Sequence, residues 1–217
     1  MNLSEQYRPR TLSELIGQPK AVKVVERIAE RGIGGRAFWI SGATGIGKTT
    51  LARIIANMIA QRHSIVEYDS ADKFKEADAD RLADTMHTYG FLSPTGLYGR
   101  ACIINEAHGL RRAVVRQLLG ILERLPGHCV VIFTTTRDGE DALFEDDIDA
   151  HPLLSRCVQI PLTNQGLAGA FAERARQVAD AEGLNGKPLA AYKRLVQRCR
   201  NNMRAVLQAV ESGEMVE

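Results

Sequence analysis

Residues 42–49 read Gly-Ala-Thr-Gly-Ile-Gly-Lys-Thr, which is a complete G-x-x-x-x-G-K-[ST] phosphate-binding loop. An apolar run at 37–40 precedes this loop, and apolar residues at helical spacing follow it from Leu51 to Ile59. A loop between a buried strand and a helix can turn its backbone N–H groups toward one point, where the helix dipole also favours anions. The order of strand, glycine loop and helix therefore predicts a binding site for a nucleoside triphosphate.

The loop motif also assigns roles to single side chains. We expect the Lys48 ammonium to reach the β and γ phosphates and the Thr49 hydroxyl to coordinate Mg²⁺. The residues expected to bind the nucleotide phosphates are Gly42, Ala43, Thr44, Gly45, Ile46, Gly47, Lys48, Thr49 and Thr50.

The composition is typical of an ordinary globular protein. The 217 residues are 45% hydrophobic and 25% charged, and the net charge of +2 requires neither a nucleic acid nor a membrane as partner. The four cysteines form no C-x-x-C pair, which argues against a zinc site. Because we find no apolar stretch of membrane length and no signal-peptide pattern, we expect a cytoplasmic protein without a membrane partner.

Short continuous apolar runs alternate with helical patterns over most of the chain. Strands buried on both faces have such continuous runs, so the alternation predicts a parallel sheet that helices cover on both faces. The expected strands cover residues 37–40, 64–68, 102–104, 129–133 and 158–162, and the expected helices between them cover 20–31, 77–87 and 111–125.

The pattern changes near residue 163, after which it is purely helical. Amphipathic helices are expected over 167–182 and 189–210. The expected organisation is an α/β domain over residues 1–162, followed by a small all-α lid domain over 163–217. Residues 1–18 of the first domain are expected to form an extended arm with a short turn capped by Thr11 or Ser13. The acidic residues 137–152 are expected to form a loop.

A second half of the site is expected where a neighbouring strand ends. An ATPase with this loop needs an acidic group there, close to Mg²⁺ and to the attacking water. Residues 101–106 end in Asn105-Glu106, and Glu106 is suited to orient or deprotonate the water. Asn105 stands where an aspartate would support the metal, and its amide can accept a hydrogen bond from a metal-bound water but carries no negative charge. We therefore expect weaker Mg²⁺ binding and slower hydrolysis.

Several segments resemble clamp-loader ATPases of the AAA+ superfamily. Residues 7–18 are similar to the opening arm of clamp loaders and of the Holliday-junction branch-migration motor. Residues 106–110 resemble the clamp-loader Walker B continuation, residues 153–157 contain the Ser-Arg-Cys signature, and residues 201–204 resemble the second sensor. The resemblance extends over most of the chain. It implies a P-loop NTPase fold of the AAA+ type, with ATP and Mg²⁺ as cofactors.

The resemblance implies further site residues. Arg156 would enter the ATP site of a neighbouring subunit, where its planar cation stabilises charge on the transferring phosphoryl group. Thr136 matches the sensor position that responds to the γ-phosphate, and Arg204 would reach the γ-phosphate of its own subunit. The expected catalytic residues are Lys48, Glu106, Thr136 and, in trans, Arg156. The residues that would line the adenine pocket are Tyr7, Arg8, Pro9, Ile16 and Gly17.

The function implied by the resemblance is that of an ATPase module in a clamp-loader-like assembly. ATP binding and hydrolysis would be coupled to loading of a DNA sliding clamp or to DNA remodelling. The expected partners are other AAA+ subunits, in a homo- or hetero-oligomer, together with DNA and a sliding clamp. Arg111, Arg112 and Arg116 are candidates for contacts to DNA phosphates, with a solvated basic face as the alternative.

Two other functions stay open. One is a non-hydrolysing, nucleotide-dependent scaffold, which the amide at Asn105 favours. The other is a branch-migration or remodelling motor, which shares the arm, although the Ser-Arg-Cys segment argues for a clamp loader. Clamp-loader subunits also carry a third helical domain that forms a collar. Since the sequence up to Glu217 does not include one, we expect either a longer protein or a different mode of assembly.

Overall fold

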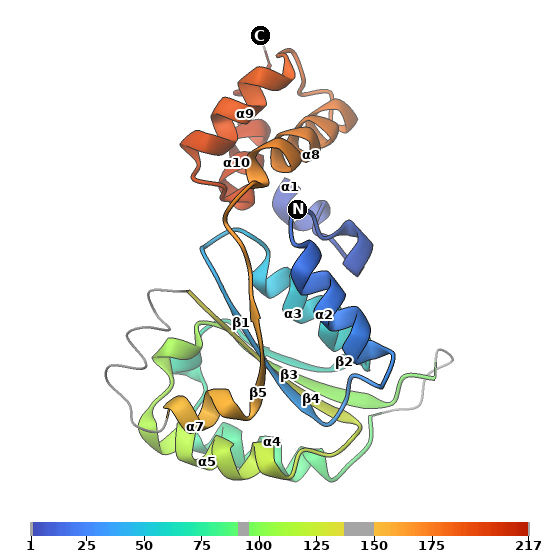
Figure 1. The fold of residues 1–217 in the computed structure, drawn as a ribbon, viewed down its shortest axis with the longest axis vertical. Coiled ribbons are helices and arrows are strands. Elements are labelled where there is room, and N and C mark those ends of the chain that lie inside the picture. Colours follow the sequence, from blue (N-terminus) through green and yellow to red (C-terminus); the bar gives the residue numbers. More distant parts are fainter. Residues whose placement is uncertain (1, 91–95, 137–149, 217) are drawn as a thin grey trace.

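A parallel sheet of five strands lies at the centre of the larger part of the chain (Figure 1). The computed structural model describes residues 2–90, 96–136 and 150–216. The strand order is β2-β3-β4-β1-β5, and every neighbouring pair is parallel. The strands are β1 (Arg36–Ser41), β2 (Ala60–Tyr68), β3 (Gly99–Ile104), β4 (Cys129–Thr135) and β5 (Cys157–Pro161). The expected parallel α/β fold is therefore confirmed.

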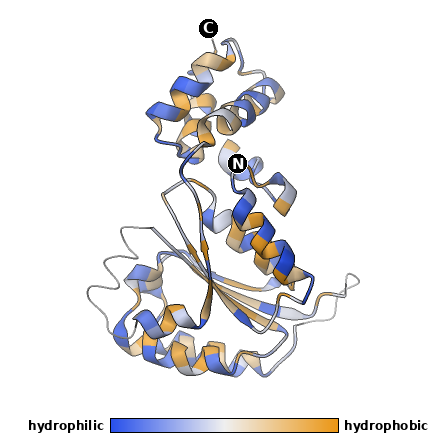
Figure 2. Cartoon of the chain, viewed as in Figure 1, coloured by the Kyte–Doolittle hydropathy of each residue, from blue (hydrophilic) through white to orange (hydrophobic). Residues whose placement is uncertain are grey.

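Helices cover both faces of this sheet (Figure 1). One face carries α2 (Pro19–Ala29) and α3 (Lys48–Asn57), and the other carries α4 (Glu76–Met86), α5 (Arg112–Glu123) and α7 (Ala150–Ser155). In β1, Phe38 and Ile40 pack on the α2–α3 side, whereas Ala37 and Trp39 pack on the α4–α5 side. Both sets are buried, which explains why the strand sequence is apolar throughout. In Figure 2, hydrophobic and hydrophilic residues alternate along these outer helices, as expected for amphipathic helices.

Three helices form the lid beyond β5 (Figure 1), namely α8 (Leu167–Ala181), α9 (Leu189–Arg198) and α10 (Met203–Glu211). The expectation of one continuous helix over 189–210 was wrong. Arg200 and Asn201 have φ values of 53° and 60°, so the backbone turns left-handed and the helix ends there. A new helix then begins at Met203, because the Asn202 side chain accepts a hydrogen bond from the Ala205 N–H and caps it.

The N-terminal arm is less extended than expected, because it contains the short helix α1 (Leu3–Gln6). The expected short turn is present as a 3₁₀ turn over Leu12–Glu14, which begins after Thr11. The buried side chains of Leu3 and Leu15 join the same hydrophobic cluster as the lid helix α8, and α1 packs against α10. The expectation failed because this packing is a long-range contact, which stabilises a helix that is too short to form alone.

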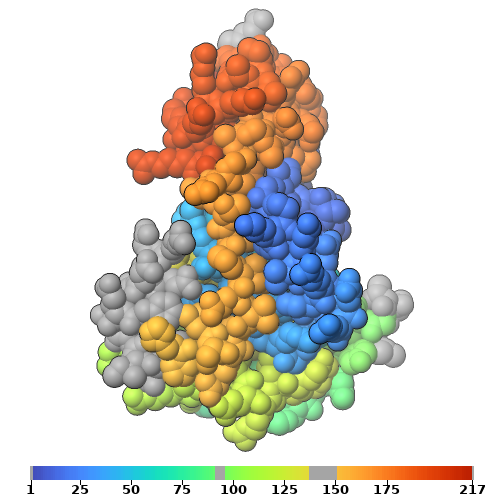
Figure 3. Space-filling view, viewed as in Figure 1, coloured from blue at the N-terminus to red at the C-terminus, as the bar shows by residue number. Residues whose placement is uncertain are grey.

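The arm and the segment after β5 lie side by side between the sheet and the lid (Figure 3). The buried Gln18 side chain donates to the Thr163 carbonyl and accepts from the Thr163 N–H, both at 2.9 Å. This pair of bonds ties the end of the arm to the point where the chain passes from β5 to the lid.

The acidic segment was expected to be a loop over residues 137–152. Residues 137–149 of this range lie outside the described residues, and α7 begins at Ala150, so the expectation was wrong for the last residues of the range. Within the described parts of the chain, none of the helices combines the length and hydrophobicity that crossing a membrane requires.

Candidate nucleotide-binding site

The glycine loop connects β1 to α3 at the carboxyl edge of the sheet. Gly42, Gly45 and Gly47 have φ values of 149°, 79° and 109°, a backbone region that residues with a side chain rarely adopt. A Cβ on Gly45 would lie 2.0 Å from the Asn202 Oδ1 atom, so space as well as backbone geometry requires glycine there. The Gly45 carbonyl also accepts a hydrogen bond from the Met203 N–H at 3.1 Å, which joins the loop to the lid.

Lys48 is the first residue of α3, and its side chain folds back into the loop. Its Nζ donates to the carbonyl oxygens of Gly42 and Ala43, each at 2.9 Å. Lys48 is only 7% exposed, and this burial lowers the pKa of its ammonium, although the nearby Glu106 carboxylate raises it in part. The structure therefore holds a partly desolvated cation at the centre of the loop, where an anionic ligand would be attracted.

Asn105 follows the end of β3 and forms the centre of a polar cluster. It is 5% exposed. Its Oδ1 accepts from the Thr49 hydroxyl at 3.0 Å and from the Thr134 hydroxyl at 2.9 Å. Its Nδ2 donates to Glu67 Oε1 and to the Tyr68 carbonyl, each at 3.1 Å. The donors and acceptors of this amide are thus all satisfied. Thr49 and Asn105, which were both expected near Mg²⁺, are hydrogen-bonded to each other.

Glu106 lies beside this cluster in an unusual backbone conformation. Its φ of 54° places a residue with a long side chain in the left-handed region, a strain that is concentrated at functional sites. Its carboxylate is 46% exposed and lies 3.7 Å from His108 Nδ1, which is itself 3.2 Å from the Thr135 hydroxyl. Glu106 lines the same cavity as Lys48.

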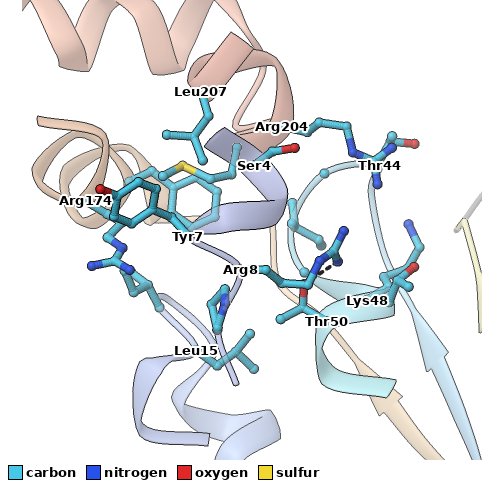
Figure 4. Close-up of a pocket in the computed structure, with 18 of the residues that line it drawn as sticks. Ser4, Tyr7, Arg8, Leu15, Thr44, Lys48, Thr50, Arg174, Arg204 and Leu207 are labelled. Carbon is cyan, nitrogen blue, oxygen red and sulfur yellow. Dashed lines mark hydrogen bonds between the residues drawn. The ribbon is translucent and has the colours of Figure 1, made fainter. Parts of the chain in front are cut away.

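The cavity lies between the loop, the arm and the lid, and it is open to solvent. Figure 4 shows Tyr7 and Arg8 from the arm, Arg174 and Arg204 from the lid, and Lys48 from the loop around this space. Pro9 and Ile16, which were expected in the adenine pocket, also line it, as do Thr44 to Thr50 of the loop segment. Lining residues that sequence reasoning missed are Ser4, Leu15, Phe171, Arg174, Met203 and Leu207.

Polar contacts connect the arm to both the lid and the loop. The Tyr7 hydroxyl donates to Glu182 Oε1 at 2.6 Å, a bond that raises the pKa of the tyrosine. The guanidinium carbon of Arg174 lies 5.9 Å from the centroid of the Tyr7 ring, within the range of a cation–π contact. Arg8 donates to the Thr50 hydroxyl at 3.0 Å and pairs with Glu5. Arg174 could have been suspected only from its place on the helix, since it belongs to no motif.

Of the expected catalytic, nucleotide and metal residues within the described part of the chain, six do not line the cavity, namely Gly17, Gly42, Ala43, Asn105, Thr136 and Arg156. Gly17 packs under the lid instead, and a Cβ there would lie 2.3 Å from Leu167 Cδ2. Thr136 lies one residue past the end of β4. Besides the Thr49 hydroxyl, Asn105 is contacted by the hydroxyl of Thr134, a residue of β4 that sequence reasoning missed.

Arg156 lies at the opposite edge of the sheet from the loop. It directly precedes β5, whose first residue Cys157 is in register with Ala37 at the start of β1. The Arg156 guanidinium donates to the Pro152 carbonyl at 2.9 Å and pairs with Glu123 on α5. The structure therefore separates Arg156 from the cavity of its own chain.

The three arginines expected to contact DNA lie at the start of α5. Arg111 is the N-terminal cap residue, Arg112 is the first helical residue, and Arg116 follows one turn later. All three are exposed, so the structure brings them together at one end of the helix.

The geometry defines a class of protein. A glycine loop between a parallel strand and a helix, next to a polar strand end, characterises phosphate-loop proteins that bind nucleoside triphosphates. The family model of the ATPase family associated with various cellular activities (AAA) matches residues 38–160, and the chain belongs to this family.

Curated relatives are subunits of bacterial DNA polymerase III. The gamma subunit of Buchnera aphidicola (subspecies Acyrthosiphon pisum) is 26% identical in an alignment of length 184, which covers 74% of this chain and 47% of the relative. The tau subunit of Bacillus subtilis is 25% identical in an alignment of length 200, which covers 82% of this chain and 33% of the relative. The chain thus spans less than half the length of these relatives. The resemblance expected from the sequence is confirmed by these relatives and by the AAA family.

Solved structures match the fold over nearly the whole chain. The RuvB Holliday junction branch migration motor of Thermotoga maritima superposes with a TM-score of 0.68 and 23% sequence identity. The match covers 94% of this chain and 64% of the RuvB chain. At this identity the likeness shows the fold alone, which agrees with the five-stranded sheet and the lid.

Proposed function

We propose that this chain is the ATP-binding module of a clamp-loader-like AAA+ assembly, in which a neighbouring subunit completes the hydrolytic site. One observation carries the proposal: Lys48 lies in the loop and Thr49 bonds Asn105 at the carboxyl edge of the sheet, whereas Arg156 lies at the opposite edge. From this position Arg156 does not reach the cavity of its own chain, but it can enter the ATP site of a neighbouring chain. The relatives named as DNA polymerase III gamma and tau support the clamp-loader type.

The residues around the loop fit a nucleoside triphosphate with Mg²⁺. The left-handed glycines form a concave backbone that a side chain would obstruct, and Lys48 supplies a buried cation inside it. Thr49 and Asn105 present adjacent oxygens, which suit a hard divalent cation held by Thr49 directly and by Asn105 through a water. Bound Mg²⁺ would neutralise charge on the phosphates.

The remaining roles follow from place and chemistry. Glu106, exposed to the cavity, is the proposed group that orients or deprotonates the attacking water. Arg204 lines the cavity from the lid and is the proposed contact to the γ-phosphate, and Thr136 is kept as a proposed sensor. The arm residues Tyr7, Arg8, Pro9, Ile16 and Gly17 form or support the proposed adenine pocket.

The proposal includes the organisation and partners of the chain. It divides the chain into an α/β domain over 1–162 and a lid over 163–217. The partners are further AAA+ subunits, DNA and a sliding clamp in the cytoplasm. Arg111, Arg112 and Arg116 are the proposed contacts to DNA phosphates, because they are exposed together at one helix end.

Nucleotide binding is the first test of the proposal. Calorimetric titration of the protein with ATP and Mg²⁺ should show binding at one site per chain. Replacing Lys48 with methionine keeps the apolar stem but removes the ammonium, so affinity should fall by about 100-fold, as expected for a hydrogen-bonded charge. Circular dichroism of the variant checks that the fold is retained. An absence of binding heat from the parent protein would refute the proposal.

A nucleotide-dependent scaffold is a second candidate function, and the amide at Asn105 is the observation that favours it. ATP turnover at increasing protein concentration, with and without DNA, separates the two functions. Turnover that rises with concentration supports the hydrolytic assembly. Tight binding without turnover at any concentration supports the scaffold. The likeness to RuvB concerns the fold and adds no support for a branch-migration motor.

A further inference from the structure

The orientation of the Asn105 amide is determined by its neighbours. Two hydroxyl donors, Thr49 and Thr134, face Oδ1, and two acceptors, Glu67 Oε1 and the Tyr68 carbonyl, face Nδ2. Rotation of the amide by 180° would bring the Asn105 oxygen to 3.1 Å from two other oxygens. The side chain can therefore present only its oxygen to Thr49.

Glu67 is itself held in place. It extends from β2, and Arg53 on α3 donates to its carboxylate from Nε at 2.8 Å and from the terminal nitrogen Nη2 at 3.1 Å. The Glu67 side chain is 20% exposed, so little solvent competes for these bonds. A guanidinium that binds both carboxylate oxygens fixes the plane of the carboxylate, and with it the direction in which Oε1 faces Asn105.

An aspartate at position 105 would not suit these surroundings. One of its oxygens could accept from Thr49 and Thr134, as Oδ1 does now. The other would lie where Nδ2 donates to Glu67 and Tyr68, about 3 Å from a carboxylate and a carbonyl oxygen. Two carboxylates at such a distance repel each other when both are ionised.

We propose that Asn105 and Glu67 form a matched pair at the carboxyl ends of two neighbouring strands. Glu67 supplies a carboxylate from β2, and Asn105 supplies an amide from the end of β3. Glu67 is a positioning residue that keeps the Asn105 oxygen directed at Thr49. The inference rests on the proposed function, since Thr49 is the expected Mg²⁺ ligand. It also changes an expectation drawn from the sequence, because Asn105 is then a fitted part of the site and an aspartate there is harmful.

A double-mutant cycle tests the pair through stability, without any ligand. Asn105→Asp alone should raise the equilibrium constant of urea unfolding about tenfold, because it places two acceptors against each other with no donor between them. In the background of Glu67→Gln, the same change should cost only about threefold, since the glutamine amide can donate to the new aspartate. Equal costs of Asn105→Asp in both backgrounds would overturn the pair.

The role toward Mg²⁺ is tested by nucleotide affinity with the metal and in EDTA. In the parent, Mg²⁺ should strengthen ATP binding, and Glu67→Gln should reduce this gain about tenfold because it weakens the hold on the Asn105 amide. The matched control is Asp69→Asn, which removes the same charge from an exposed residue two positions further on. It should leave the gain within about twofold of the parent. Equal losses in both variants would show that only net charge matters and would overturn the positioning role.

The two proposals fail in different ways. If the parent does not bind ATP, the proposed function fails, whereas the unfolding cycle still decides whether Asn105 and Glu67 are paired. If the parent binds ATP with Mg²⁺ and Asn105→Asp is more stable and gains more from the metal, the proposed function stands and the matched pair is refuted.

Discussion

The polar groups at the two ends of the parallel strands differ in burial. At the carboxyl edge, Lys48, Asn105 and Thr134 are buried and bonded to partners within the chain. At the amino end of β5, Arg156 is exposed and pairs with Glu123 at the surface of α5. The first edge is organised by the chain alone, whereas the second presents a cation outward.

The energetic consequences of this difference are unequal. Breaking one bond of a buried polar cluster leaves a desolvated group without a partner, which is costly. An exposed ion pair is screened by water and contributes little, so an incoming anionic group can replace Glu123 as the partner of Arg156. This difference supports the proposal that a single chain can bind ATP, whereas hydrolysis requires Arg156 from a second chain.

Arg156→Ala should have the largest effect on ATP turnover, and it tests whether the amino edge of the sheet acts on another subunit. If Arg156 acts on a neighbouring subunit, turnover of the assembled protein should fall by about 10³-fold, as for other trans-acting arginines. ATP affinity of the dilute chain should stay unchanged, because Arg156 lies away from its own cavity. Steady-state hydrolysis against protein concentration, combined with calorimetry, measures both quantities.

Arg156→Lys is the control for charge, since lysine keeps the cation but lacks the planar fork. Its turnover should stay well below that of the parent. A turnover equal to the parent's in Arg156→Ala would contradict the trans assignment.

A smaller effect is expected for the reactivity of two buried cysteines, one near each edge of the sheet. Burial raises the pKa of Cys102 in β3 from 9.0 to about 12, and burial raises the pKa of Cys157, next to Arg156, to the same value. At pH 8 both thiols should therefore react with iodoacetamide at least about tenfold more slowly in the folded than in the urea-unfolded protein. Peptide mass spectrometry measures each thiol. Rapid labelling of Cys157 alone would show that the chain around Arg156 opens.

The same pKa shifts give a direction for alkaline stability. The folded-state pKa of each thiol is raised, so the stabilising contribution is fully present below pH 9.0 and is lost as pH rises toward about 12. Replacing both cysteines with alanine should flatten this part of the profile of unfolding free energy against pH.

The smallest expected effect is the change in unfolding free energy when one polar interaction is removed at each edge. Thr134→Val keeps the shape of a residue that is 1% exposed but removes its hydrogen bond to Asn105. The free energy of unfolding should fall by about 1 kcal/mol, since the Asn105 oxygen keeps its bond from Thr49. At the other edge, Glu123→Gln should give no measurable change, because the pair is exposed. Urea unfolding measures both changes. A larger loss of unfolding free energy for Glu123→Gln than for Thr134→Val would contradict the expected difference between the two edges.

Much of the fold could be predicted because its signals are local. The apolar runs of β1, β3 and β4 and the helical spacing of α3 and α5 are visible within short windows. The break between α9 and α10 was missed because the hydrophobic spacing continues across it. The left-handed turn at Arg200 and Asn201 instead brings Asn202 against Gly45 of the loop, more than 150 residues away in the chain.

The sequence by itself determined the parallel α/β fold, the glycine loop and membership of the AAA family, because strand and helix periodicity and the loop motif are properties of neighbouring residues. Only the tertiary structure decided which groups surround Asn105. Glu67 and Thr134, which are 38 and 29 residues away from it, come from the two strands that flank β3. Strand order and register bring these side chains together, and no local pattern encodes that pairing.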